Sequence, residues 1–513
     1  MDRRAFLRRA PRARAVPDLP HARTDASLAP YAGTWGVPQA MHLVRRTSVG
    51  ASRADVVAAL TRGSAASAAA NLVASAQARP LPDTPSWASQ TTGNGGTNIE
   101  WLYEWQRGWY AELVEGGLRE KMTLFWHDHF ATQQAVYEHA AFAVDYLTFL
   151  RARALGPFAP LLEGIGTRPA MLLFLDNDTN VAGDLNENYA REILELFSMG
   201  LAGPDGAANY TQADVVEAAR ALTGWVVNEA QIRCDFVPSR HDNGDKTLFG
   251  HAVARGANGR ADHDALVAHI FQHRTPQIAH FLAGKLYAWF VHPVPNAGVV
   301  DALAARLDAS DLDVADAVEA LLGSAHFYSA DVVGARLKSP VELALGIGRE
   351  LGLPATAGVL ERTREVTQQL GQELLNPPSV EGWAGLDDPL EYRAWITTGS
   401  VPTRRGLADE AVFADDAFPD ADPLELVDQI SDRTDPYRIA ADLTAHLVAL
   451  PMSAEATDAL AEQTLLNGVP ESYDRPLRIS FWTEIAVSPG PQARTRVREL
   501  LSALVNLPEY QLV

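Results

Sequence analysis

The chain has 513 residues, of which 47% are hydrophobic and only one is cysteine. This length allows more than one domain and a large buried core. The formal net charge of -21 excludes nucleic-acid binding by neutralisation of phosphates, because that needs a basic surface. The single cysteine excludes an internal disulfide and a zinc–cysteine cluster within one chain. No apolar run reaches the roughly 18 residues of a transmembrane helix, so we expect a soluble protein without a membrane span.

The amino terminus, M-D-R-R-A-F-L-R-R-A, resembles a twin-arginine export signal through Arg3, Arg4, Phe6 and Leu7. A stretch containing proline and arginine stands where the apolar region of such a signal should follow. We therefore expect residues 1–30 to form a disordered basic tail with a degenerate signal. A cytoplasmic location is expected, and export by a twin-arginine-type route is the alternative.

Apolar residues recur at spacings of three and four along most of the chain, which predicts a mainly α protein, a large multi-helix array with few short strands. The expected helices cover residues 100–116, 120–155, 212–222, 261–271, 277–291, 299–322 and 341–353. Short apolar runs at residues 171–175 and 394–398 are expected as strands. From residue 409 the composition turns acidic and contains several prolines. We therefore divide the chain into a main helical domain, residues 31–408, and an acidic linker with a C-terminal helical subdomain, residues 409–513.

The segment D-N-D-T-N-V-A-G-D-L-N-E, residues 176–187, carries oxygen-bearing side chains at the offsets used by a calcium-binding loop of the EF-hand type. The expected ligands are Asp176, Asp178, Asn180, Asp184 and Glu187. Val181 stands where such a loop needs glycine for its sharp turn. The alternative is that these Asp and Asn residues make turns and cap the helix that follows.

Apolar spacing predicts a helix from about residue 188, and its polar face carries two ladders at a spacing of four. Glu187, Arg191 and Glu195 form one ladder, and Asn188 and Glu192 form the other. Ion pairs on a solvated face are the ordinary explanation of such a pattern. The concentration of carboxylates and arginine also makes this helix start a candidate catalytic segment.

His127 and His129 lie two residues apart, in the run W-H-D-H. On a strand or loop they could share a metal ion, whereas on a helix they lie about 200° apart. The apolar spacing around them predicts a helix, which favours an interior role, and both remain candidate metal ligands. Trp126 either lines a pocket or fills the core.

A further candidate site is the loop that holds His241, Asp242 and Lys246, together with glycine and asparagine. Loops do not need these side chains for packing, so function and turn formation are both open interpretations. Trp225 and Trp383 each follow a glycine, in T-G-W and E-G-W. Their rings are candidate substrate contacts, with hydrophobic anchoring as the alternative.

Several motifs occur in an order that resembles the bacterial domain-of-unknown-function family 1800. They are E-K-M-T-L-F-W-H-D-H-F, N-E-N-Y-A-R-E, Y-T-Q-A-D-V, L-T-G-W, R-L-K-S-P and P-P-S-V-E-G-W. The resemblance extends from His42 to Tyr510, nearly the whole chain. The family has no settled activity, so the resemblance implies no mechanism, and a function has to be argued from the candidate site.

These patterns lead us to expect a metal-dependent enzyme, a hydrolase, whose site combines the region of His127, the helix start at residues 186–195 and the loop at residues 241–246. A divalent ion would polarise the substrate, and Glu192 or Glu187 would be a ligand or the general base. Arg191 would hold a negatively charged oxygen. Asn186, Asn188, Trp126, Trp225 and Trp383 are the candidate substrate-binding residues.

The residues do not distinguish calcium, zinc, manganese and copper as the ion, and they leave the substrate open as a small molecule or a glycan. Three other functions remain open. The first is a carbohydrate-active helical enzyme with structural calcium. The second is a copper or iron oxidoreductase that uses His127, His129 and His241. The third is a non-enzymatic binding or assembly protein whose polar clusters are structural.

Overall fold

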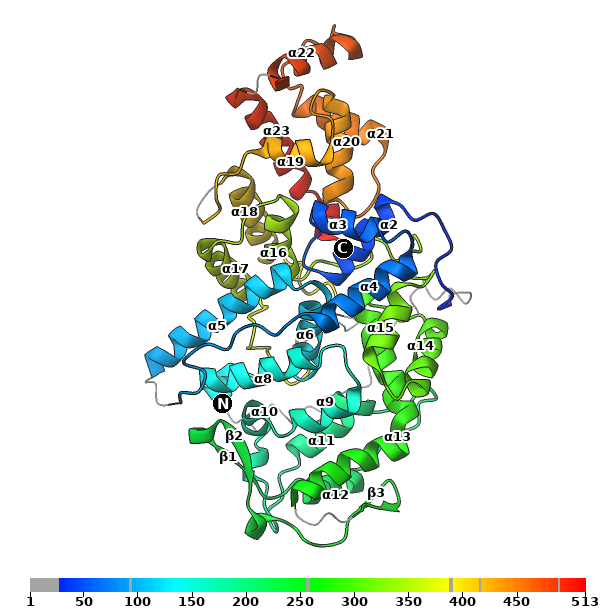
Figure 1. The fold of residues 1–513 in the computed structure, drawn as a ribbon, viewed down its shortest axis with the longest axis vertical. Helices are drawn as coiled ribbons and strands as arrows, with labels where there is room; N and C mark the ends of the chain where they lie inside the picture. The colour runs from blue at the N-terminus through cyan, green and yellow to red at the C-terminus, as the bar shows by residue number, and fades with distance from the viewer. Residues whose placement is uncertain (1–26, 92–94, 255–258, 387–390, 415–416, 488–489) are drawn as a thin grey trace.

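The computed structural model describes residues 27–91, 95–254, 259–386, 391–414, 417–487 and 490–513. The twin-arginine-like start, and the expected tail as far as residue 26, lie outside this part of the chain. Helices dominate the described residues, and the named strands there form two two-stranded sheets, so the prediction of a mainly α fold is confirmed. Figure 1 shows an elongated array, with the C-terminal helices at one end and α12 (Gln212–Ala221) and α13 (Gly259–Phe290) at the other.

The other helices vary widely in length. Before α12 the chain forms α2 (Val37–Thr47), α3 (Arg53–Leu60), α4 (Ala65–Ala78), α5 (Gly95–Glu115), α6 (Gly117–His129), α7 (Gln134–Tyr137), α8 (Ala140–Ala152), α9 (Phe158–Ile165), α10 (Pro169–Phe174), the 3₁₀ turn η1 (Asn177–Thr179), α11 (Asn188–Leu194) and the π-helical turn η2 (Glu195–Met199). After α13 it forms α14 (Ala297–Ala309), α15 (Val314–Leu322), α16 (Pro340–Glu350), α17 (Ala357–Gln369), α18 (Ser400–Phe413), α19 (Pro423–Ile430), α20 (Pro436–Leu447), α21 (Ala454–Gln463), α22 (Arg475–Val487) and α23 (Pro491–Val505). Local chemistry sets several starts: Thr211 and Ser339 each form a complete capping box at the first turn.

Two antiparallel hairpins follow α12 in the chain. They pair β1 (Trp225–Asn228) with β2 (Arg233–Phe236), and β3 (Thr247–Leu248) with β4 (His251–Ala252). Phe249 and Gly250 make the turn between β3 and β4, with positive φ angles of 55° and 78°. Positive φ at both positions is the backbone of a tight two-residue hairpin, in which glycine is favoured and phenylalanine is strained.

The structure corrects some of the predicted elements. Residues 171–175, expected as a strand, lie mostly in α10, and residues 394–398, also expected as a strand, are turns and loop. A short apolar run does not by itself distinguish a buried strand from a buried helix. The expected helices at residues 261–271 and 277–291 are joined in α13, which continues through Pro276.

Two large hydrophobic cores hold the array together. The larger one gathers apolar side chains from α2 to α15, and the smaller one gathers those of α18 to α23. Helix α16 contributes to both, because Val341 and Leu345 pack in the larger core while Leu343 and Ile347 pack in the smaller one. This helix therefore connects the two parts of the molecule.

Charged side chains are buried near this connection. Lys121 of α6 donates to Glu342 of α16, and Lys338 lies 3.1 Å from Glu350. The hydroxyl of Tyr510, near the end of the chain, donates to Glu350 at 2.7 Å. All five side chains are almost fully buried. Removing one partner of such a pair leaves a buried charge unpaired, so these contacts depend on one another.

In the part of the chain that the structure describes, no single helix is long and apolar enough to cross a membrane. The pair α3 and α4, bent by 119°, passes that test of length and composition only when both helices are counted together.

Candidate functional site

The helix start predicted near residue 188 exists, and its geometry changes at Glu195. Helix α11 ends there and continues as the π-helical turn η2, in which the Gly200 amide donates to the Glu195 carbonyl at 2.9 Å. The Ser198 hydroxyl donates to the Ile193 carbonyl at 2.6 Å, which supports the widened turn. π-Helical turns are rare and are often found at functional sites, because they redirect side chains from the regular helix.

Two carboxyl groups lie on adjacent turns at this point, Glu192 and Glu195. The Tyr210 hydroxyl donates to Oε2 of Glu195. Glu192 is partly buried and has no hydrogen-bond partner among the described residues. Burial, followed by the charge of Glu195, raises the pKa of Glu192 to about 8 against the opposing effect of Arg191, and Glu381 adds to the rise. Glu192 is therefore the carboxyl here that keeps its proton at neutral pH.

The predicted pair of Glu187 and Arg191 is present one turn before Glu192. Nη2 of Arg191 lies 3.1 Å from Oε2 of Glu187 and donates to Oε1 of Gln212 at 2.9 Å. The Gln212 amide in turn donates to Glu187 at 2.8 Å. About two fifths of the Arg191 side chain is exposed, at 39%. Glu187 and Arg191 thus connect the start of α11 to Gln212 at the start of α12.

A cavity of about 650 Å³ is lined in part by Tyr210, the residue that donates to Glu195. Its wall comes from the segment before α12, from α12 itself, from the β3–β4 hairpin and from α13. The lining residues are Ala208, Asn209, Tyr210, Thr211, Ala213, Asp214, Glu217, Arg220, Asp245, Thr247, Phe249, Gly250 and Arg274. Tyr210 belongs both to this wall and to the contact with Glu195, whereas Glu192 and Glu195 are not among the lining residues. Its volume is in the range of small-molecule sites.

The run W-H-D-H forms the end of α6 and is buried. Both ring nitrogens of His127 have protein partners: Nδ1 pairs with the Tyr146 hydroxyl at 3.1 Å, and Nε2 accepts from the Leu375 amide at 3.1 Å. Burial lowers the pKa of His127 to about 3, so its ring is neutral. Leu375 has a positive φ of 66°, and the bond to His127 helps to hold this strained backbone in place.

Asp128 and His129 hold two further segments. Oδ1 of Asp128 accepts from the Trp383 amide at 2.7 Å. Gly382, with a φ of +78°, lies so close that an added Cβ would come within 2.3 Å of Asp128. Nε2 of His129 contacts the Phe197 carbonyl in η2 at 3.1 Å. The H-D-H run therefore fixes the segment at residues 375–383, which carries Glu381, and also the π-helical turn beside Glu192.

The three candidate tryptophan rings all lie in the interior. Trp126 is fully buried, and its indole N–H donates to the Ala154 carbonyl at 2.9 Å. Trp383 packs edge-on against His127, with ring centroids 5.3 Å apart. Trp225 is 2% exposed. Their positions fit the anchoring alternative, and none of the three lines the cavity.

The expected calcium loop is held together by its own amides. Asn180 is fully buried, with its Nδ2 donating to the Ala219 carbonyl at 2.9 Å and its Oδ1 accepting from the Asn186 amide at 3.1 Å. The Asn186 side chain donates to the Asp176 carbonyl at 3.2 Å, and its Oδ1 accepts from the Asn188 amide at 3.0 Å. Asn180, Asn186 and Asn188 thus act as turn and cap residues. Asp184 lies in the same loop and is exposed.

Among the described residues, no three His, Cys, Asp or Glu side chains lie so that they could hold a metal ion. The structure therefore does not gather His127, His129, Glu187 and the oxygens of the loop at residues 176–184 around one point. Burial, followed by the charge of Asp176, raises the pKa of Asp178 in spite of hydrogen bonds and Arg240, which lower it.

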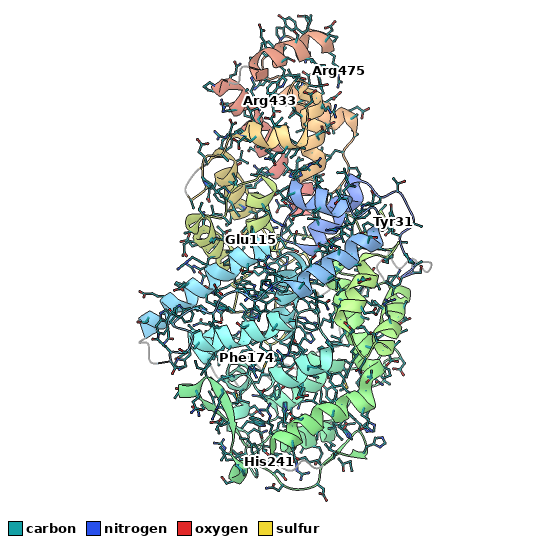
Figure 2. The ribbon with its side chains drawn as sticks, viewed as in Figure 1. Tyr31, Glu115, Phe174, His241, Arg433 and Arg475 are labelled. Carbon is teal, nitrogen blue, oxygen red and sulfur yellow. The ribbon has the colours of Figure 1, made fainter. Side chains whose placement is uncertain are left out.

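The loop with His241, Asp242 and Lys246 forms a buried network whose central carboxylate is Asp262 of α13. His241 Nε2 lies 2.9 Å from Asp262 Oδ2, and Lys246 Nζ lies 3.2 Å from the same oxygen. The other nitrogen of His241 contacts Thr223. Figure 2 shows His241 at the end of the molecule opposite Arg433 and Arg475. These side chains fasten the loop to α13.

Asp242 does not orient His241, although it is its neighbour in sequence. Its carboxylate pairs with Arg220, from Oδ2 to Nε at 2.8 Å. The hydrogen bonds from Arg220 lower the pKa of Asp242 to about 2. Sequence reasoning missed Asp262 because it lies 16 and 21 residues from its partners Lys246 and His241.

The family of the chain follows from a match to a protein-family model. The model of the family described as protein of unknown function, DUF1800, matches residues 42–512, nearly the whole chain. The chain belongs to the DUF1800 family. The resemblance expected from the sequence motifs is thereby confirmed. No curated protein and no solved structure matches the chain.

In this DUF1800 protein, the structure brings together only part of the residues selected from the sequence. Glu187, Arg191 and Glu192 lie on α11 and at its start, near the cavity. Sequence reasoning included Glu195 in the helix start at residues 186–195, but it did not assign Tyr210 or Glu381 to the site. Tyr210 and Glu381 stand in motifs of the DUF1800 resemblance, Y-T-Q-A-D-V and P-P-S-V-E-G-W, which is the signal that could have selected them.

Proposed function

We propose that this DUF1800 protein is a hydrolase that works by acid–base catalysis with the carboxyl groups of Glu192 and Glu195. One feature of the geometry carries the proposal: the carboxyl group of Glu192 is largely buried close to Glu195, with no hydrogen-bond partner for it among the described residues, and this burial raises its pKa to about 8. A carboxyl group with this pKa holds a proton at neutral pH and can donate it to a leaving group.

Glu195 supplies the complementary function. Its Oε2 accepts the hydrogen bond of Tyr210, which fixes the carboxylate beside the cavity. The remaining oxygen takes a proton from a water molecule as this water attacks the electrophilic atom of the substrate. The bond to the leaving group breaks while Glu192 gives its proton to the leaving oxygen or nitrogen. Side chains three residues apart on a helix lie about 5–6 Å apart at Cβ, so both can reach one bound substrate.

The arrangement favours acyl or phosphoryl transfer to water over cleavage of a glycoside. The two carboxyls of a glycosidase flank the sugar ring from opposite faces. Glu192 and Glu195 belong to one helix and approach a substrate from the same side.

The sequence led us to expect a metal-dependent hydrolase. The metal content of the purified protein tests this hypothesis against acid–base catalysis by Glu192 and Glu195. No step above is routed through an ion, because His127, His129 and Asn180 are engaged with protein partners. Mass-spectrometric metal analysis of the wild type and of Glu192→Gln decides between the two hypotheses. A stoichiometric ion that is lost in the variant would make Glu192 a ligand and would overturn its role as proton donor.

The direct test is hydrolysis of chromogenic esters, phosphoesters, amides and glycosides. Glu192→Gln and Glu195→Gln are each expected to lower the rate by about a hundredfold or more, which is the ordinary contribution of general acid–base groups. Glu163→Gln, an exposed position on α9, is the matched control and should keep the wild-type rate. A folded Glu192→Gln variant with unchanged rates on a substrate that the wild type cleaves would contradict the proposal.

A further inference from the structure

Three histidines meet on the cavity side of α13. His269 and His273 lie one helical turn apart on α13, and His251 reaches them from β4. The rings of His251 and His273 are stacked, with centroids 4.2 Å apart and planes inclined by 9°. The centroids of His269 and His273 are 4.3 Å apart. We refer to these three residues as the histidine stack.

The geometry of the stack fits neutral rings better than a shared metal ion. The rings of His251 and His273 lie face to face, so their nitrogens are held in parallel planes, while the ring of His269 is inclined by 48° to that of His273. Among the described residues no three His, Cys, Asp or Glu side chains are placed to hold a metal ion. Two imidazolium ions at this separation would repel each other, because like charges at short range raise the energy of the charged forms. Desolvation, followed by the charges of His269, His251 and Arg274, lowers the pKa of His273 below its ordinary value of 6.5.

The β3–β4 hairpin that carries His251 also forms part of the cavity wall. Thr247, Phe249 and Gly250 line the cavity. Apart from the stack, the hairpin is held by two carboxylates of α12: Asp214 accepts from the Phe249 amide at 2.6 Å and Glu217 accepts from the Thr247 amide at 2.9 Å. It is therefore anchored on one side by α12 and on the other side by the rings of α13.

We propose that the β3–β4 hairpin is a pH-sensitive wall of the cavity, closed by the neutral histidine stack and loosened when His273 takes up a proton. The inference rests on the proposed function and deepens it, because the wall of this cavity includes Tyr210, which donates to Glu195. His251 is exposed, so protons reach the stack directly from solvent.

The direction of the effect follows from the pKa of His273. Because the closed state lowers this pKa, closing the hairpin is most favourable above the ordinary value of 6.5 and weakens as the pH falls through it. The other charged groups around the stack do not cancel this effect. They are Arg274 on α13, which lies over the Phe249 ring at 4.0 Å, Asp214 on α12, which faces Arg274, and Lys246, which is committed to Asp262. Arg274 adds a positive charge and so strengthens the repulsion.

Hydrogen exchange of the hairpin amides tests the proposal without any substrate. Exchange at residues 246–254 would be measured by mass spectrometry at about pH 7.5 and about pH 5.5, corrected for the intrinsic rate at each pH. In the wild type, the protection factors of these amides should be about tenfold lower at about pH 5.5 than at about pH 7.5. His273→Phe keeps an aromatic ring that cannot titrate, and its protection should change by less than about twofold.

The matched control is His280→Phe, on the same helix but paired with Asp301 at 3.3 Å, away from the hairpin. It should respond to pH as the wild type does. His273→Tyr, which also keeps an aromatic ring and does not titrate between these pH values, gives the same test if His273→Phe does not fold. Protection that is equal at both pH values in the wild type, or lost equally in His273→Phe, would overturn the proposal. Because exchange is the readout and Glu192 is untouched, this failure is distinct from a failure of the proposed hydrolase.

Discussion

Glu192 is held in an environment that favours its protonated form, and this has a consequence for stability. Its pKa is about 8 in the folded protein against an ordinary 4.5, so between these values the folded state keeps a proton that the unfolded chain has released. The stability that Glu192 contributes is therefore complete below about pH 4.5 and is lost as the pH rises through 8.

Glu192→Gln should consequently stabilise the protein at alkaline pH. The amide keeps the shape of the side chain and removes the charge, so we expect a gain of roughly 2–4 kcal/mol at about pH 9, after an allowance for partial exposure, and almost none at about pH 5. Calorimetric or chemical unfolding at both pH values measures the difference. Equal effects at the two pH values would mean that Glu192 does not titrate near pH 8. A variant that gains stability while losing activity is typical of a strained functional residue.

At the scale of single residues, the sequence predicts contacts between side chains that are close in the chain, but it predicts contacts between distant segments poorly. The contact between Glu187 and Arg191 follows from their spacing on a helix, and the structure contains it. The bond of Tyr210 to Glu195 spans 15 residues and joins two separate segments, so no helical period encodes it. The raised pKa of Glu192 depends on burial, which arises only when Glu381 and the rest of the chain have packed around it.

At the scale of elements, His127, Asp128 and His129 at the end of α6 hold two other segments in place, residues 375–383 and η2. We call this end of α6 the clamp. Asp128→Ala should leave the Trp383 amide without its partner in the interior, which costs about 1–3 kcal/mol. The segment at residues 375–383 should loosen, and Glu381 should move away from Glu192. With that negative charge more distant, the pKa of Glu192 should fall.

Urea unfolding gives the stability of the Asp128→Ala variant, and ¹³C NMR of labelled glutamate carboxyls gives the pKa of Glu192, with the signal assigned by its absence in Glu192→Gln. Asp308→Ala, at an exposed position on α14, is the control and should change neither quantity. A loss of stability with an unchanged Glu192 titration would show that the clamp supports the fold without influencing the site.

The presence of the helices can be predicted from the sequence because their apolar periodicity is strong. Their boundaries are predicted less accurately. The sequence predicted separate helices at residues 261–271 and 277–291, but α13 passes through Pro276 between them. Packing against η2 and α14 supports this helix although proline lacks an N–H donor. The run M-L-L-F-L at residues 171–175 fits a buried strand or a buried helix, and only its neighbours decide the outcome.

At the scale of the whole molecule, the two cores are linked by buried charged side chains. Each of these side chains depends on its ion-pair and hydrogen-bond partners, because an unpaired charge in the interior is unfavourable. Tyr510→Phe would remove the hydroxyl that donates to the buried carboxylate of Glu350 at 2.7 Å. A hydrogen bond to a buried charged group contributes about 1.5–3 kcal/mol, so we expect a loss of that size. Thermal and urea unfolding measure it, and Tyr473→Phe, at a side chain that is 40% exposed, should have no effect. Equal stabilities of the two variants would mean that Lys338 alone satisfies Glu350.

The clamp at the end of α6 also determines when the site can form during folding. His127 and Asp128 are separated along the chain from Leu375 and Trp383 by 248 and 255 residues. Contacts of such long range form slowly, because a large loop must close before they contribute. In a refolding experiment, far-ultraviolet circular dichroism should recover first, as the helices form, and the hydrolytic activity that we propose should return in a later kinetic phase.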